Sequence, residues 1–304
     1  SATNNFIYRE GQSALASLSY ATRGFGAVMQ LKRVDNMGFK SDRSQLGNAL
    51  DINFIPPINR IHAYSLTGRY PYATQANGEM GMQLQLNYKI PRGSLLGGKY
   101  GTSVALNFSQ VNDIARTALN DTTAIGQDGT KGYKSKFFAV SDHVFFRDFN
   151  IEIDKRFSPK LKGLFQYLNL HYDIATLQGH AGEEAVEANI ALADFTYKLS
   201  NRKAIRVEAQ ALLTQQDMGD WAALMAEYTI APKWFVSVAD QYNFGNPDKE
   251  MRKHYYTVSA GTTRGASRLA LSAGRQAEGV VCVGGVCRQV PASSGVTVTF
   301  STSF

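Results

Sequence analysis

The sequence GVTVTFSTSF, residues 295–304, predicts a β-strand with two chemically different faces. Apart from Thr302, one parity is apolar and the other carries only threonine and serine; the apolar set is Val296, Val298, Phe300 and Phe304. Successive side chains of a strand point to opposite faces. A soluble protein would bury the apolar face in a core, so the fold depends on whether the rest of the chain repeats the pattern.

The same alternation recurs along the whole chain. Segments with it are residues 50–54, 64–69, 79–90, 102–109, 145–157, 205–211, 222–230, 255–260 and 268–273. Two segments follow it less well. In residues 186–199 the apolar parity switches near Ala193, which indicates a β-bulge or a change of environment. In residues 234–244 Asp240 interrupts the apolar parity, and an acidic group facing lipid at mid-membrane costs about 2 kcal/mol or more. That strand therefore either contains a bulge or contacts protein.

Composition narrows the class of protein. The chain has 304 residues with a net charge of +7, and its mean hydropathy is −0.24. It contains no run of about 18 apolar residues, which argues against transmembrane helices. A transmembrane barrel has such a hydropathy, because half of each strand faces a polar lumen. The basic residues are scattered and do not alternate with aromatic residues, so no nucleic-acid partner is expected.

The connections between these segments alternate in length. Short ones are residues 22–24, 55–60, 158–160, 199–203, 231–233 and 263–267; longer ones are residues 35–47, 70–79, 112–133, 174–184, 245–252 and 277–290. Outer-membrane barrels have short periplasmic turns and long outer loops. We therefore predict one domain over residues 1–304: an all-β, transmembrane, antiparallel up-and-down barrel of about 16 strands, with about 14 as an alternative. The higher count requires a first strand at residues 4–10 and one long strand over residues 142–157.

The strand parity also predicts which charged residues line the lumen. They are Lys32, Asp51, Arg69, Lys89, Asp148, Glu152, Asp154, Arg156, Arg206, Glu208, Glu227 and Arg268. Both signs are present, so strong ion selectivity is not expected. An open channel and a network of paired charges that fills the barrel are both compatible with this set.

Several segments resemble a known family. A last strand that ends in phenylalanine is similar to the C-terminal signal read by the outer-membrane assembly machinery. The segments RVDNMGFKSDR, RYPYATQANGEMG and YKIPRGSLLGGKYGTSVALNFS resemble an uncharacterised family of outer-membrane β-barrels of Bacteroidota. The resemblance covers most of the chain and implies no activity. Members of the family extend further at the N-terminus, so residues 1–304 form either a complete barrel or the C-terminal part of a longer protein.

Cys282 and Cys287 lie in the loop sequence VVCVGGVCR. Their spacing can bring the two sulfurs together across a hairpin tip. A disulfide would imply an oxidising compartment; the alternative is two free thiols buried in an apolar loop.

No catalytic or metal site stands out. His171 and Asp173 share a parity within reach of a general-base arrangement, but no partner nucleophile is identifiable. The sequence HAGEE at residues 180–184 matches no strong metal motif. We expect no enzymatic activity, no metal and no cofactor.

Two functions remain from the sequence alone. The first is a porin-like channel for small hydrophilic solutes in the bacterial outer membrane. The second is a non-transporting barrel that serves as a partner or scaffold subunit of an outer-membrane protein assembly. Expected partners are outer-membrane lipid and lipopolysaccharide, the assembly machinery during biogenesis, and a protein partner in the second case.

Overall fold

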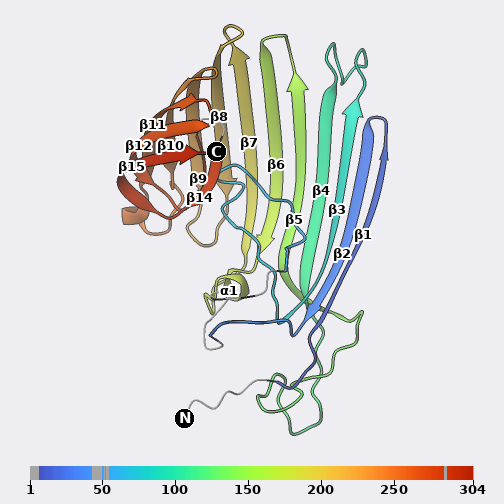
Figure 1. The fold of residues 1–304 in the computed structure, drawn as a ribbon. Helices are drawn as coiled ribbons and strands as arrows, with labels where there is room; N and C mark the ends of the chain where they lie inside the picture. The colour runs from blue at the N-terminus through green and yellow to red at the C-terminus, as the bar shows by residue number, and fades with distance from the viewer. Residues whose placement is uncertain (1–6, 43–49, 51, 53–54, 284–285, 304) are drawn as a thin grey trace.

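The computed structural model describes residues 7–42, 50, 52, 55–283 and 286–303, with only the backbone described for residues 280–283 and 286–289. This part contains a 13-stranded antiparallel sheet in the order β1 to β12 followed by β15, and a separate hairpin of β13 and β14 (Figure 1). The strands of the sheet are β1 (Gln12–Thr22), β2 (Phe25–Asp35), β3 (Gly78–Ile90), β4 (Thr102–Ile114), β5 (Val140–Arg156), β6 (Leu161–Tyr172), β7 (Val186–Lys198), β8 (Lys203–Leu213), β9 (Trp221–Ile230), β10 (Trp234–Tyr242), β11 (His254–Arg264), β12 (Ser267–Gln276) and β15 (Ser293–Thr302). The hairpin strands are β13 (Gly279–Val283) and β14 (Val286–Val290), and one short helix, α1 (Ile174–Leu177), follows β6.

The sheet is an up-and-down meander, as predicted. Each strand pairs with its neighbour in the chain until β12, which pairs with β15. Short connections, such as those after β1, β5, β7, β9 and β11, lie at one end of the sheet, which we call the turn end (Figure 1). The longer connections, including residues 36–77 and 115–139, start from the opposite end, the loop end. The predicted asymmetry of the connections is confirmed, and so is the long strand over residues 142–157.

The strand count of about 16 is wrong for the part of the chain that the structure describes. Residues 7–11 are not a strand, and the rest of the predicted first strand lies outside the described residues. So do Asp51, Asn53 and Phe54 of the strand predicted at 50–54. Residues 64–68 form turns rather than a strand, and residues 55–60 are not a short connection. The described residues between β2 and β3 (36–42, 50, 52 and 55–77) instead belong to one connection, in which Leu66, Tyr70 and Tyr72 are buried against the sheet.

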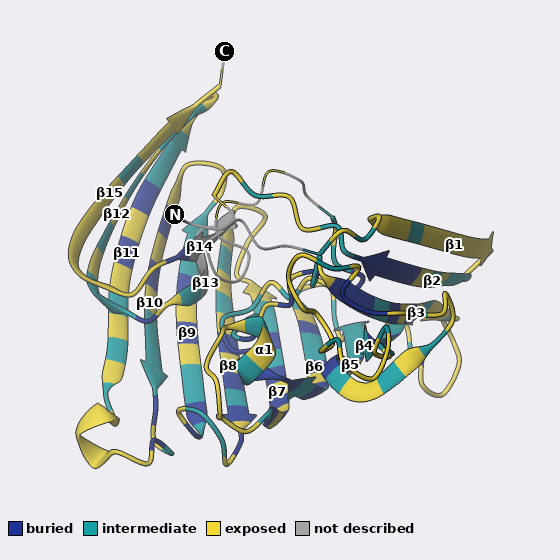
Figure 2. Ribbon diagram, turned by 90° about the horizontal axis from the view of Figure 1, so that it is seen from below, coloured by how far each residue is buried: buried dark blue, intermediate teal, exposed yellow. Residues whose placement is uncertain are grey.

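The sheet curls into a trough, and its two edge strands lie on opposite sides (Figure 2). Neither β1 nor β15 pairs with a second strand among the described residues. Both run from the loop end to the turn end, since Thr22 precedes the first tight turn and Thr302 pairs with Ser267 beside the last one. Closure of a barrel is therefore not observed in the structure.

The two faces of the sheet have inverted polarity compared with a soluble protein. The face that we call the outer face carries exposed apolar side chains on strand after strand, including Leu18 (72 % exposed), Leu224 (59 %) and Val296 (70 %). The opposite, inner face carries buried polar groups such as Asp148 and Asn150, both 0 % exposed. Registers along the sheet keep each set on its own face; Leu84, Phe108 and Phe149, for example, are consecutive partners.

The parity switch near Ala193 reflects a change in the surroundings of β7 along its length. The β6–β7 and β7–β8 registers run through this region without a shift, so there is no bulge. Toward the turn end, the outer face of β7 carries Phe195 and Tyr197; toward the loop end it carries Glu187 and Asn189. There the inner face becomes apolar instead, because Ile190 is fully buried in a core on that side.

Candidate functional site: the inner face of the sheet

Residues 55–77, which we call the inner segment, lie across the inner face of the sheet. In Figure 1 this stretch runs in front of β5 to β8. Its apolar residues belong to one core with side chains of β4 to β9 near the loop end. The set is Ile58, Leu66, Tyr70 and Tyr72 together with Val111, Phe146, Leu168, Leu170, Ile190, Leu212 and Trp221. Gly81 of β3 permits the close approach, because a Cβ there would lie 3.1 Å from Ile58 Cδ1. The inner segment therefore fills this half of the trough.

Polar contacts fasten the first part of the inner segment to β5, β6 and β7. Arg60 Nη2 lies 2.5 Å from Glu152 Oε2. His62 Nε2 lies 2.7 Å from Asp148 Oδ2, and its Nδ1 lies 3.2 Å from Gln166 Nε2. Asp148 is fully buried, and a buried carboxylate without a partner is costly. The His62 contact is therefore a strong determinant of where the inner segment lies.

Three tyrosines of the inner segment donate hydrogen bonds to carboxylates. Tyr64 donates to Asp194 of β7 at 3.0 Å, and Tyr70 donates to Asp217 in the β8–β9 connection at 2.9 Å. Tyr72 donates to Glu79 of β3. Burial, followed by the neighbouring carboxylate, raises the pKa of each of these tyrosines. All three phenols therefore stay protonated at neutral pH, which the hydrogen bonds require.

Lys32 of β2 connects this network to Glu79 of β3. Its Nζ lies 2.6 Å from Glu79 Oε1, and both side chains are buried. The same ammonium group donates to Pro56 O and to Thr74 Oγ1 at 2.8 and 2.7 Å. Lys32 thus holds both ends of the inner segment.

Most residues predicted to line a lumen lie on the inner face. Lys32, Asp148 and Glu152 bind the inner segment or its ends. Asp154 pairs with Lys162 at 2.6 Å, and Arg206 pairs with Asp194 at 2.9 Å and with Glu208 at 2.6 Å. Glu227 lies opposite Arg206 in the β8–β9 register. The guanidinium of Arg268 lies 4.6 Å from the ring centre of Phe235. That these residues line a lumen stays a prediction.

Two further predicted lumen residues also occupy inner-face positions, since Lys89 shares its strand parity with Asn87 and Arg156 shares its parity with Asp154. Lys89 and Arg156 lie near the turn end, and Arg156 donates to Ser158 O. Arg69 is not on a strand: it belongs to the inner segment, and its guanidinium lies 3.9 Å from the ring centre of Trp221. Asp51 lies outside the described residues.

Sequence reasoning missed Arg60, His62, Tyr70, Tyr72 and Glu79 as parts of this network. Prolines at 56, 57 and 71 were a usable signal, because proline is confined to the edges of sheets. Together with the spacing of the three tyrosines, they mark a stretch that is extended but not a strand.

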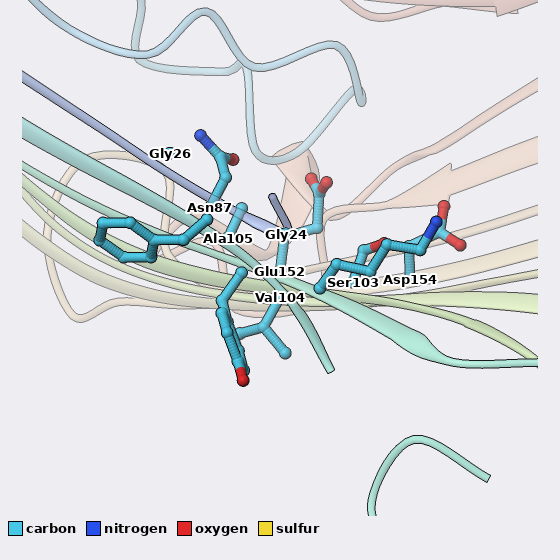
Figure 3. Close-up of a pocket in the computed structure, with 11 residues that line it drawn as sticks. Gly24, Gly26, Asn87, Ser103, Val104, Ala105, Glu152 and Asp154 are labelled. Carbon is cyan, nitrogen blue, oxygen red and sulfur yellow. The ribbon is translucent and has the colours of Figure 1, made fainter. Parts of the chain in front are cut away.

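A hollow of about 360 Å³ lies on the inner face at the turn end. Figure 3 shows Glu152 and Asp154 of β5 beside Asn87 and Ser103, with Gly24 and Gly26 at its wall. Gly24, Gly26 and Ala105 leave space at this wall between longer side chains such as Lys89 and Glu152. The inner segment therefore does not cover the inner face at this hollow.

The inner face of β10 to β15 differs from the part beneath the inner segment. Its inward positions are small or uncharged and mostly hydroxyl-bearing; they include Ser237, Thr257, Ser259, Ser272, Thr297 and Thr299. Ser259 donates to Ser272 at 2.8 Å. Arg268 is the charged residue among the inward positions described on these strands. Charge is thus concentrated on β2 to β9.

Asp240 is on the outer face without a bulge, because β10 keeps its register with both neighbours. Its Oδ2 lies 2.7 Å from His254 Nδ1, and the His254 ring stacks on Tyr242 at 4.1 Å. The acidic group therefore has a hydrogen-bond partner on β11, toward the loop end.

His171 and Asp173 do not come together. His171 Nδ1 lies 2.5 Å from Glu187 Oε1 on the outer face. Asp173 is buried, caps α1, and lies 2.8 Å from His143 Nε2. Within the described ranges, no group of three or more histidine, cysteine, aspartate or glutamate residues is arranged to hold a metal ion. No helix in that part of the chain is both long and apolar enough to cross a membrane.

The backbone places Cys282 directly opposite Cys287 in the β13–β14 hairpin. Opposite residues of an antiparallel pair have Cα atoms about 4.5 or 5.5 Å apart, a separation that a disulfide spans. Their side chains lie outside what the structure describes, so the disulfide stays a prediction. In β15, Val296, Val298 and Phe300 are exposed on the outer face as predicted, and Phe304 lies outside the described residues.

The fold and the inner face define an all-β protein with an antiparallel meander, an apolar outer face and a polar interior. The chain belongs to the Family of unknown function (DUF6029), whose model matches residues 1–304. No curated protein matches it. Among solved structures, a mutant of the Rh. blastica porin is similar with a TM-score of 0.37 and 12% identity, over 87% of this chain and 84% of the porin chain.

Proposed function

We propose that this protein is an outer-membrane β-barrel channel for small hydrophilic solutes, narrowed by the inner segment. The inverted polarity of the sheet carries this proposal. Exposed apolar patches on soluble monomers rarely exceed a few hundred Å², whereas here they extend over the outer face from Leu18 on β1 to Phe300 on β15. Lipid is the solvent that matches such a face, and water matches the charged inner face.

The outer face also has the zonation that a bilayer requires. Trp234 and Tyr197 lie near the turn end. Aromatic side chains are favoured at the interface between membrane and water. Toward the loop end, the outer face becomes polar at Glu187, His171 and Asp240. The shortest strand of the sheet, β10, has 9 residues, and about 9 to 11 tilted residues cross the hydrocarbon layer. These features support a membrane band on the turn-end side, with longer loops beyond it.

A membrane channel also requires the sheet to close. An unpaired edge inside lipid leaves backbone groups unsatisfied at several kcal/mol each. Because β1 and β15 run in the same direction, one further strand antiparallel to both would add to the 13 observed and complete a barrel of about 14, an even number as in bacterial barrels. We propose this closure, and we propose that the outward residues of β15 are what the assembly machinery reads.

Single-channel recording in a planar bilayer tests the channel. The purified protein, shown to be folded by heat-dependent gel mobility, is expected to give stable steps that scale with salt concentration. The inner segment favours one second candidate, a closed barrel that serves as a scaffold subunit, because it covers the inner face from β3 to β8. Silence from a folded barrel would reject the channel and favour the scaffold, and a protein that stays monomeric without detergent would reject both.

A further inference from the structure

A second hollow lies between the inner segment and the inner face of β8 to β11. Tyr64 and Ser65 form one side, and Glu208, Ser237, Gln241 and Thr257 contribute to the other. It differs from the turn-end hollow in being covered by the inner segment. The inner segment, the five strands β8 to β12 and Ala277 therefore converge on one hollow, and seven of its 14 lining residues are uncharged and polar.

The groups that face this hollow suit a hydroxyl-rich ligand. Serine and threonine hydroxyls and the amide of Gln241 both donate and accept hydrogen bonds, and so do the hydroxyls of a saccharide. Glu208 and Ser237 are buried, at 7 % and 4 % exposed, so the hydrogen-bonding positions at the wall are largely shielded from bulk water. Its wall also contains Ala223, Met225 and Ala239, and a mainly apolar lining with a few polar groups is the usual form of a ligand site.

Charge at the hollow disfavours ions of either sign. Glu208 Oε2 is 2.6 Å from Arg206, and its Oε1 accepts from Gln210 at 2.7 Å; a solute cation would have to displace Arg206. An anion would meet the Glu208 carboxylate at the wall. The guanidinium groups beside this wall are already engaged, Arg206 by Glu208 and Arg275 by the ring of Tyr255 at 5.0 Å. Asp240 reaches the wall from β10, but its carboxylate pairs with His254 on the outer face.

We propose that this hollow is a binding subsite for uncharged, hydroxyl-rich solutes of the saccharide class. The inference rests on the proposed channel. The hydroxyl-bearing inner wall of β10 to β15 continues from the hollow, so such a solute would pass along this side while the inner segment covers the charged side. The channel would then favour neutral saccharides over sugar acids of equal size.

Tryptophan fluorescence can measure binding without any current. The chain has two tryptophans; Trp234 lies on the outer face, and Trp221 lies 5.6 Å from Tyr255, which lines the hollow. In a Trp234→Phe background, glucose added to the detergent-solubilised protein is expected to change the fluorescence saturably, and gluconate is not. Thr257→Val removes one hydroxyl from the wall and should raise the apparent dissociation constant about fivefold. Thr299→Val, on the same wall but outside the hollow, should leave it unchanged.

Bilayer recording separates this inference from the channel proposal. Glucose is expected to reduce the open-channel current saturably in the wild type and less in Thr257→Val. Saturable glucose binding by a protein that never conducts would keep the subsite and reject the channel. A conducting protein with no saturable glucose response, or with equal responses to glucose and gluconate, would overturn the subsite.

Discussion

At the scale of single residues, the tyrosines of the inner segment connect its position to pH. Tyr64, Tyr70 and Tyr72 each donate to a carboxylate, and each has a raised pKa through burial and that carboxylate. A group whose pKa is higher in the folded state contributes its stability in full below its unfolded value, about 10 for tyrosine, and loses it as the pH rises through the folded-state value. We therefore expect the inner segment to stay docked at neutral pH and to detach in strong alkali. Tyrosinate absorbance at high pH should show a late-titrating group of tyrosines, and Tyr70→Phe should reduce that group by one.

Tyr197→Phe is the matched control for this titration. Tyr197 is exposed on the outer face near the turn end, so its removal controls for the loss of one tyrosine outside the inner segment. A titration in which Tyr70→Phe removes early signal would show that Tyr70 is not held against Asp217.

At the scale of elements, the period-2 alternation predicted the strands because each has an apolar outer face and a polar inner face. The same signal failed at residues 64–69, where Tyr64 and Leu66 alternate with polar residues but face the sheet as a folded-in connection. Alternation reports that one side of a stretch is buried; it does not report whether the stretch pairs with neighbours. The interior network was only half predictable for this reason: its strand residues, such as Asp148 and Arg206, follow from parity, whereas His62 and Tyr70 depend on where a long connection lies.

The His62–Asp148 contact gives a prediction for the inner segment as an element. His62→Ala leaves Asp148 buried with fewer partners, and we expect the docking of the segment to weaken by about 2 kcal/mol. Hydrogen exchange should then be about thirtyfold faster at the Leu66 amide, which donates to Gln210, while the strand amides keep their rates. His180→Ala, in the exposed β6–β7 connection, is the control. Unchanged exchange at Leu66 in His62→Ala would show that apolar packing alone holds the segment.

At the scale of the whole molecule, the direction of the two edge strands decides how the trough becomes a barrel. If β1 and β15 paired directly, they would form a parallel seam with backbones about 4.8 Å apart. With one antiparallel strand between them, the spacing is about twice that, beyond the roughly 7 Å that a disulfide spans between Cα atoms.

Cross-linking between the two edge strands tests this arrangement. We predict that the double variant Ala16→Cys, Val298→Cys, with both cysteines at outward positions, forms no disulfide in the membrane-inserted protein. A bismaleimide about 10 Å long should join the two cysteines. Leu18→Cys with Met29→Cys, which are register partners on β1 and β2, should form a disulfide, and the wild type controls for Cys282 and Cys287. A disulfide between positions 16 and 298 would show a directly closed barrel with a parallel seam. That outcome would leave the inner segment and the saccharide subsite in place, because both are built on strands away from the seam.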